Sequence, residues 1–212
     1  MPVHTRSPGE VMHTRQERKR RTRRALLDAA LELLEEQGFA SLSLRQVTRL
    51  AGVVPTAFYR HFPDMDSLGV ELVEESIGTL RRMIRSAREE DIGYEKVIAR
   101  SVQILVRHVH EHRAHFRFVA RERSSGVAAV RHAIREQFAL FTSELAADLR
   151  GFPVFTDWTT EDRQLLAEII VNHLVLSAEA IMESPATEHE AVRHAEKQLR
   201  MIVIGLSGWT SR

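Results

Sequence analysis

GFASLSLRQVTRLAGVVPTAFYRHF, residues 38–62, is the stretch that decides the fold of this 212-residue chain. Ser41-Leu42-Ser43 offers a hydroxyl cap for a helix over residues 44–51, and Gly52 suits a tight turn that needs a positive φ angle. Pro55 suits the first turn of a second short helix, which we expect to end near His61. Two short helices joined by a three-residue turn have the spacing of a helix-turn-helix, whose second helix enters the major groove of DNA.

The second of these helices carries polar groups that can donate hydrogen bonds to phosphates or base edges. These groups belong to Thr56, Tyr59, Arg60 and His61. Its apolar side is expected to pack with the preceding helix and form the inward face of a small core. We assign Val47, Leu50, Phe58 and Phe62 to that face.

The rest of the chain also has apolar residues at helical spacing, and the pattern predicts an all-α fold. An apolar stripe over residues 25–34 stops at Gly38, and Asp64 or Asp66 can cap the next helix. Helices are predicted over residues 65–88, 94–112, 114–124, 127–150, 160–183 and 188–206. The expected organisation is a disordered tail (1–14), a helix-turn-helix domain with a basic arm (15–64) and a larger helical domain (65–212).

The composition excludes several classes of protein. The chain has no cysteine, which rules out disulfides, thiol catalysis and cysteine zinc sites. Residues 1–9 lack the apolar core of a signal peptide, and no apolar run approaches the length of a membrane span. We therefore expect a cytoplasmic protein with no membrane partner.

The charge is unevenly distributed along the chain. Residues 1–62 hold 11 Lys/Arg against 6 Asp/Glu, whereas residues 63–212 hold 19 against 23. The basic arm consists of Arg15, Arg18, Lys19, Arg20, Arg21, Arg23 and Arg24. Either it is a solvated, disordered tail or it contacts DNA phosphates or the flanking minor groove, and its position beside a helix-turn-helix favours DNA.

The stretch from Arg24 to Phe62 resembles the N-terminal domain of the TetR repressor family, and the YRHF ending after Gly52 and Pro55 is especially typical. The resemblance implies a non-enzymatic homodimer that binds palindromic operator DNA, with a small hydrophobic effector and no cofactor. We predict DNA contacts from Arg20, Arg21, Arg24, Ser43, Arg45, Pro55, Thr56, Tyr59, Arg60 and His61.

A closer resemblance connects residues 40–69, VEESIGTLRRMIRSAR (73–88) and FRFVARERSSG (116–126) to the fatty-acid-responsive FabR and DesT kind of TetR repressor. It implies control of unsaturated fatty-acid metabolism by long-chain acyl-CoA. The predicted ligand site comprises Leu80, Met83, Ile84, Ile104, Leu105, Phe116, Arg121, Arg123, Phe138 and Phe141. Most of the apolar members are expected to be ordinary core, which is the better explanation for any one of them.

The chain departs from the family pattern at two places. Thr48 stands where the family often has a small Ala between the two helices, so their packing is expected to shift slightly. The segment Pro63-Asp64-Met65-Asp66 lacks the Lys that many members use on a phosphate, so that contact is not carried over.

Three features of the larger domain have two readings each. The segment 121–126 suits a phosphate-bearing headgroup, or places arginines at a helix C-terminus with a salt bridge to Glu122. For the run His108, His110, His112 and His115, we favour a solvated or pH-responsive cluster over a metal site. His173 is interpreted as a core or interface histidine with satisfied hydrogen bonds rather than as a ligand. The apolar helices 165–181 and 192–206 form a dimer interface or are buried within the chain.

Three functions remain to be compared. The first is an operator-binding repressor tuned by long-chain acyl-CoA, and the second is the same repressor tuned by another hydrophobic molecule, such as a drug linked to efflux. The third is an all-helical enzyme acting on acyl thioesters. The sequence argues against the enzyme, because it has no nucleophile elbow and no Gly-rich phosphate loop.

Overall fold

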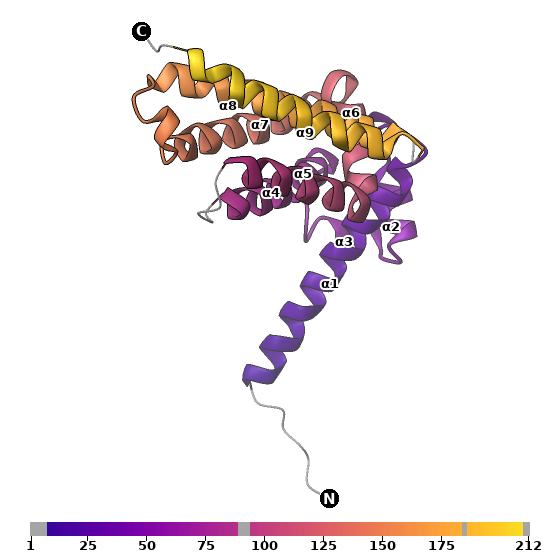
Figure 1. The fold of residues 1–212 in the computed structure, drawn as a ribbon. Coiled ribbons are helices and arrows are strands. Elements are labelled where there is room, and N and C mark those ends of the chain that lie inside the picture. The colour runs from indigo at the N-terminus through magenta and orange to yellow at the C-terminus, as the bar shows by residue number, and fades with distance from the viewer. Residues whose placement is uncertain (1–7, 89–93, 184–185, 210–212) are drawn as a thin grey trace, which may run out of the picture.

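The computed structural model describes residues 8–88, 94–183 and 186–209, and in these ranges it contains nine α-helices and no strand. The all-α fold predicted from the sequence is confirmed. A long first helix leaves the body at one end, while the last two helices run together across the opposite side (Figure 1).

The N-terminal part comprises α1 (Pro8–Leu34), a 3₁₀ turn (Phe39–Ser41), α2 (Leu44–Leu50) and α3 (Pro55–Phe58). Ser43 and Gln46 form a reciprocal capping box at the start of α2, and Gly52 has a φ of 66° in the turn. Pro55 occupies the first turn of α3 as predicted. The helix α3 ends at Phe58 rather than at the predicted His61, although turn hydrogen bonds continue through Phe62.

The first helix begins earlier than the sequence pattern suggested. It starts at Pro8, so residues 8–14, predicted as part of a disordered tail, lie on α1, and the rest of that tail lies outside the described residues. The basic segment 15–24 is therefore a continuous part of a 27-residue helix.

Six helices form the larger part of the molecule, and their bounds agree closely with those predicted. They are α4 (Met65–Arg88), α5 (Tyr94–Glu111), α6 (Arg113–Ser125), α7 (Ala128–Leu149), α8 (Thr160–Glu183) and α9 (Glu188–Gly205). Two 3₁₀ turns, Pro153–Phe155 and Leu206–Gly208, follow α7 and α9. Asp64 caps α4 as expected, because its Oδ1 accepts the Ser67 backbone N–H at 2.7 Å.

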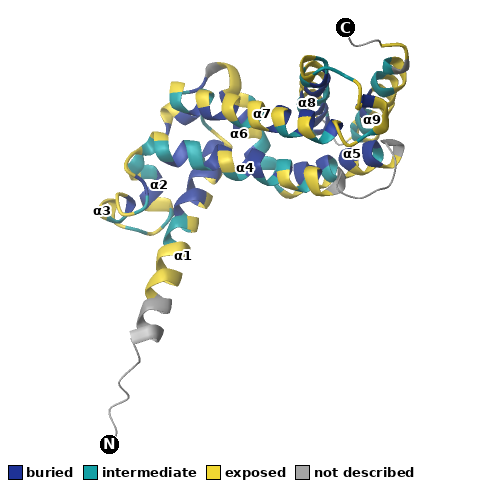
Figure 2. Ribbon diagram, turned by 90° about the vertical axis from the view of Figure 1, so that its left-hand side faces the viewer, coloured by how far each residue is buried: buried dark blue, intermediate teal, exposed yellow. Residues whose placement is uncertain are grey.

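The buried side chains divide into two clusters. One joins α1, α2 and α3 to the first half of α4, to α6 and to the start of α7, and includes Phe39, Phe58 and Phe118. The other lies among α4, α5, α7, α8 and α9. Figure 2 shows the two ends of the molecule, with α2 and α3 at one and α8 and α9 at the other, connected through α4 and α7. The helix-turn-helix therefore shares its core with the body.

Gly69 marks the closest approach within this shared core. A Cβ built at Gly69 would lie 2.6 Å from Cζ of Phe39 and 2.8 Å from Cγ2 of Val130. We expect Gly69→Ala to lower the free energy of unfolding by about 1–2 kcal/mol, because overpacking outweighs the gain in helix propensity. Urea denaturation at fixed protein concentration measures this change.

Gly78 on the same helix is the matched control. A Cβ there would meet its nearest neighbour, an Arg82 side-chain nitrogen, at an ordinary 3.4 Å. Gly78→Ala is therefore expected to raise the free energy of unfolding by up to about 1 kcal/mol. Equal stabilisation by both substitutions would contradict the close packing described at Gly69.

One described helix, α8, is long and apolar enough by composition to cross a membrane, contrary to the expectation of no such segment. It packs against both α7 and α9, and 39% of its apolar window is buried inside the chain. Leu165, Ile169 and Leu176 are about half exposed, so α8 presents one apolar face to the core and another outward.

Candidate functional site

The turn that follows α3 presents two exposed side chains at the tip of the helix-turn-helix. Tyr59 is 62% exposed and Arg60 is also exposed, while Phe58 and Phe62 are fully buried directly beside them. Between ring centres, the Phe58 ring lies 5.7 Å from that of Tyr59, in an edge-on arrangement, and 5.5 Å from that of Phe62, in a tilted one. Because these buried rings fix the backbone, Tyr59 and Arg60 are held pointing outward. The predicted contacts Pro55 and Thr56 are exposed at the start of α3.

The helix α2 contributes Ser43 and Arg45 from its exposed first turn. The Ser43 hydroxyl is engaged in the capping box, so it fixes the start of the helix. Thr48 is buried, and its hydroxyl donates to the Leu44 carbonyl at 2.9 Å, which satisfies it within the helix. The assignment of Leu50 to the inward face was wrong: it is 43% exposed, because α2 turns this position outward.

His61 closes the turn and lies between exposed and buried surface. Burial is the main cause that lowers its pKa, and the positive charges of Arg23, Lys19 and Arg60 lower it further. The imidazole is therefore neutral near pH 7. Its backbone carbonyl accepts a hydrogen bond from Arg23 Nη1 at 2.7 Å, which ties the end of the turn to α1.

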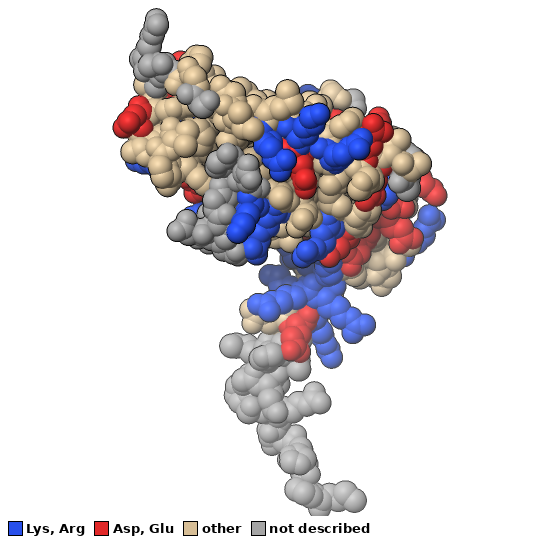
Figure 3. Space-filling view, viewed as in Figure 1, with Lys and Arg blue, Asp and Glu red and all other residues tan. Residues whose placement is uncertain are grey.

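The basic side chains of α1 gather where this helix leaves the body (Figure 3). Arg20 and Arg21 are exposed there, as are Arg15, Arg18 and Lys19. A helix with clustered Arg and Lys beside a helix-turn-helix forms a positive surface that suits the phosphate backbone of DNA.

The last two arginines of this segment are engaged with α4 instead. Arg24 forms ion pairs with Glu75 and with Asp28, so the structure directs this predicted DNA contact toward the body. Arg23 forms an ion pair with Glu71, and its guanidinium lies 4.5 Å from the centre of the Phe62 ring. The sequence did not distinguish these two from their neighbours, because nothing in a run of arginines shows which face meets α4.

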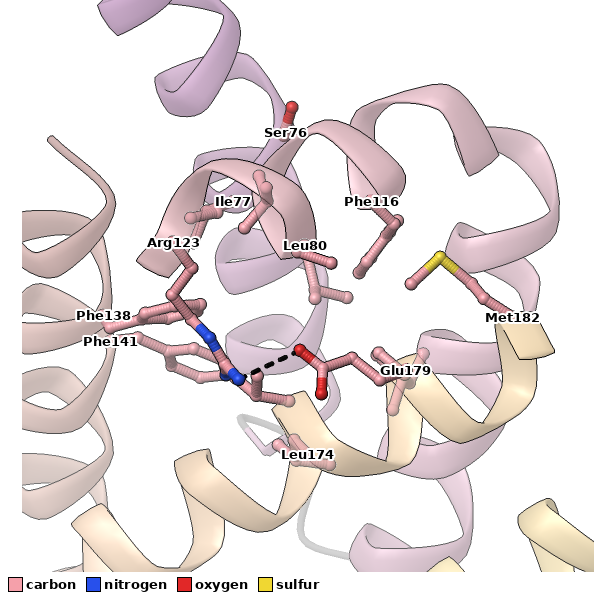
Figure 4. A pocket seen from close by; sticks show the side chains of 15 residues that line it. Ser76, Ile77, Leu80, Phe116, Arg123, Phe138, Phe141, Leu174, Glu179 and Met182 are labelled. Atoms are coloured by element: carbon pink, nitrogen blue, oxygen red, sulfur yellow. Dashed lines mark ion pairs between the residues drawn. The ribbon is translucent and has the colours of Figure 1, made fainter. Parts of the chain in front are cut away.

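A narrow apolar pocket lies among α4, α5, α6, α7 and α8. The cavity itself has a volume of about 50 Å³, and the space between its side chains, with the open solvent at its mouth, amounts to about 580 Å³. Six of the ten predicted ligand residues line it: Leu80, Leu105, Phe116, Arg123, Phe138 and Phe141. At one side, Arg123 Nη2 pairs with Glu179 Oε1 at 3.2 Å, as the dashed line in Figure 4 marks. The pocket thus combines an apolar interior with one charged pair.

The α8 wall of this pocket was missed by sequence reasoning. It comprises Leu174, Val175, Ala178, Glu179 and Met182. The helical period of α8 was evident, but the period alone does not show which helix each face meets.

The other four predicted ligand residues lie elsewhere. Met83 and Ile104 line an open groove between α4 and α5, beside Arg82 and Arg107. Ile84 lines a third cavity, toward α9. Arg121 faces away from the pocket and its guanidinium donates to the carbonyls of Leu34 and Gln37 at the end of α1.

The segment 121–123 therefore divides between two tasks. Arg121 donates to a carbonyl at a helix C-terminus, as one of the two interpretations proposed. The helix is α1, however, and not α6, to which Arg121 belongs. Glu122 is 3% exposed, and its carboxylate accepts the backbone N–H of Phe39 at 2.9 Å. Arg123, on the next face, lines the pocket. The helix α6 thus touches the pocket on one side and the helix-turn-helix domain on the other.

Two members of the histidine run are buried, so the expectation of a solvated cluster was wrong, whereas a pH-responsive cluster stays a prediction. His108 is 1% exposed and His115 is 6% exposed, while His110 faces outward and pairs with Glu188. Burial lowers the pKa of His108 and of His112, and so does the mutual proximity of the imidazoles. His173 matches its predicted role, because its Nε2 lies 3.2 Å from the Ala195 carbonyl.

Two family models match this chain and together span most of it. Residues 26–72 match the model described as bacterial regulatory proteins, tetR family. Residues 94–205 match the tetracyclin repressor-like C-terminal domain.

Solved structures of similar fold cover nearly the whole chain. A transcriptional regulator from Pseudomonas aeruginosa PAO1 has a TM-score of 0.72 at 19% identity, covering 87% of this chain and 91% of its own. The fatty acid degradation regulator FadR from Bacillus halodurans has a TM-score of 0.71 at 18% identity, covering 90% and 97%. The transcriptional regulator FadR from Bacillus subtilis, in complex with stearoyl-CoA, has a TM-score of 0.70 at 16% identity, covering 85% and 97%.

Proposed function

Since this chain belongs to the tetR family of bacterial regulatory proteins, we propose that it is a dimeric repressor whose operator affinity is set by a long-chain acyl-CoA. Regulators of this family bind operator DNA, usually as dimers, respond to small-molecule effectors and need no cofactor. The family is non-enzymatic, so the hypothesis of an acyl-thioester enzyme is set aside.

The apolar pocket beside the Arg123–Glu179 pair carries the acyl-CoA proposal. Leu80, Phe116 and Phe138 offer a hydrocarbon chain an apolar environment, which favours burial by the hydrophobic effect. Arg123 provides a cation for the polar end of such a ligand. The stearoyl-CoA complex of the Bacillus subtilis neighbour supports the same ligand class.

The two faces of α6 supply a route from pocket to DNA. Phe116 and Arg123 line the pocket, whereas Arg121 and Glu122 hold the end of α1 and the Phe39 turn. A ligand that moves the pocket face of α6 therefore moves the support of the helix-turn-helix. Such a ligand shifts operator affinity only by its differential binding to the two positions of α6.

The outer faces of α8 and α9 support dimerisation. Ile169 and Leu176 on α8 and Met201 and Ile204 on α9 are all more than half exposed. Burying this surface against a second copy would make a four-helix interface, which is also an explanation for the apolar composition of α8. Two copies would then present their recognition turns, each the turn after α3 that carries Tyr59 and Arg60, to the two halves of a palindromic operator.

Fluorescence anisotropy tests the proposal, with the protein titrated into its upstream DNA at fixed salt, alone and with stearoyl-CoA or oleoyl-CoA. We expect a 5- to 150-fold change in operator affinity, different for the two acyl chains. Ala178→Phe should remove the response, because it fills the pocket at a buried position. Ala139→Phe adds the same bulk to an exposed site on α7 and should retain it.

Operator binding that neither acyl-CoA changes would leave the repressor but contradict the acyl-CoA assignment. The pocket would then be assigned to another hydrophobic effector, and the same Ala178→Phe variant would serve to identify it.

A further inference from the structure

A compact group of imidazole and carboxylate side chains lies at the end of α5, apart from the recognition turn. Among the residues that the structure describes, His108, Glu111 and His112 bring their ligand atoms within 4.8 Å of one another. His108 and Glu111 lie on α5, and His112 is the turn residue that follows it, its backbone N–H donating to the His108 carbonyl at 3.0 Å. From the sequence alone, Glu111 was noted only as material for acid–base chemistry, and a solvated or pH-responsive cluster was favoured here over a metal site.

The hydrogen bonding of His108 suits a metal ligand. Its Nε2 lies 3.5 Å from the backbone carbonyl of Ser76, whereas its Nδ1 is buried and has no hydrogen-bond partner. A metal-ligating imidazole characteristically directs one nitrogen to a carbonyl or carboxylate and offers the lone pair of the other to the ion. An orphaned polar atom in a side chain that is 1% exposed is costly unless something binds it.

Further donors adjoin this group on α4 and α6. The His112 ring lies 4.4 Å from that of His108 and 5.5 Å from that of His115, measured between ring centres. His115 Nε2 and Glu75 Oε2 are 3.7 Å apart, and both atoms are buried without a hydrogen-bond partner. The cluster therefore holds one nitrogen without a partner, His108 Nδ1, beside an imidazole–carboxylate pair whose atoms are too far apart for a hydrogen bond.

We propose that His108, Glu111 and His112 bind one zinc ion, with His115 or Glu75 completing the coordination. Mixed imidazole and carboxylate donors suit zinc, whereas magnesium and calcium prefer oxygen alone. Tetrahedral zinc holds its ligand atoms about 3.4 Å apart, given a Zn–N distance of about 2.0–2.1 Å. The ligand atoms of His108, Glu111 and His112 lie within 4.8 Å of one another in this structure.

The position of the site gives the ion a structural effect. The His108 ring meets Phe116 of the pocket edge-on at 5.6 Å, and Glu75 pairs with Arg24 of α1. An ion at this point would fasten α5 to α6 and α4 between the pocket and the first helix. The zinc proposal makes no assumption about acyl-CoA or operator binding, and it stands or falls independently of them.

The test uses tag-free, full-length protein stripped with chelator and dialysed against Zn²⁺ or Co²⁺ at pH 7.5. We expect one equivalent of metal per chain by elemental analysis and the visible absorption of tetrahedral Co²⁺. Zinc at 100 times its Kd should raise Tm by roughly 5–10 °C. His112→Gln and Glu111→Gln should each weaken binding at least 10-fold, and both alter positions less buried than His108.

His110→Gln is the matched control, because it removes an imidazole from the same helix but on the outward face, where it pairs with Glu188. Retained stoichiometry and spectrum in this variant, with loss in the other two, would establish the site. Circular dichroism of each metal-free variant reports whether its helices are intact. Failure of the native protein to bind Zn²⁺ below about 100 μM, or equal binding by all three variants, would overturn the proposal.

Discussion

Replacing Tyr59 or Arg60 by alanine is expected to weaken operator binding by roughly 30- to 20,000-fold. A good side-chain contact to a base edge is worth about 1–3 kcal/mol, and a symmetric dimer loses each contact twice. Both side chains point outward beside the fully buried Phe58 and Phe62, so their removal leaves the small core intact. Anisotropy titration measures the affinity, and sedimentation checks that the dimer persists.

Two controls separate specific contact from loss of charge or bulk. Tyr59→Phe keeps the ring and removes only the hydroxyl, so its loss relative to Tyr59→Ala apportions the contact between the two. Arg135→Ala removes one positive charge from an exposed site on α7, and we expect less than a threefold effect. Normal operator binding by both the Tyr59 and Arg60 alanine variants would show that the recognition surface lies elsewhere.

Phe118→Ala is expected to lower the free energy of unfolding by about 3–5 kcal/mol. Phe118 is 2% exposed, and its ring packs 6.1 Å from that of Phe39, between ring centres, where α6 meets the helix-turn-helix domain. Because the core is shared, the loss should appear as one displaced transition rather than as early melting of the N-terminal helices alone. Urea denaturation followed by circular dichroism and by tryptophan fluorescence, at one protein concentration, measures it.

Phe116→Ala, on the same helix, provides the comparison. Phe116 is partly buried and faces the pocket, so its loss should cost less than that of Phe118 while impairing the response to acyl-CoA. Equal destabilisation by the two substitutions, or separate transitions in the Phe118 variant, would contradict a single continuous core.

The sequence predicted the helices well because their boundaries depend on local chemistry. Ser43 caps α2, Gly52 takes a positive φ angle and Asp64 caps α4, each as expected from its neighbours alone. These features are determined by neighbouring residues in the sequence and do not depend on tertiary contacts. Tyr59 and Arg60 are exposed after the short helix, and their contact with DNA stays a prediction.

Predictions that depended on tertiary partners were less successful. Leu50 is apolar yet exposed, and Arg24 looks like its basic neighbours yet pairs with Glu75. The α8 wall of the pocket and the joining of His115 to His112 across the α5–α6 break were not evident either. Helical periodicity defines the faces of a helix, but the partner of each face is decided by distant segments of the chain.

The core that extends from α1 through Phe118 to Val130 and Ile134 limits how this gene can be recombined. A hybrid regulator made by joining residues 1–64 to the sensor of a distant relative would place Phe39 and Phe58 against side chains that never evolved to receive them. A functional hybrid would have to contain the N-terminal half of α4, α6 and the start of α7 from the same protein as residues 1–64. The helix-turn-helix and the part of the body that shares its core are therefore expected to be inherited together, and new operator preferences to arise by point substitution more readily than by shuffling.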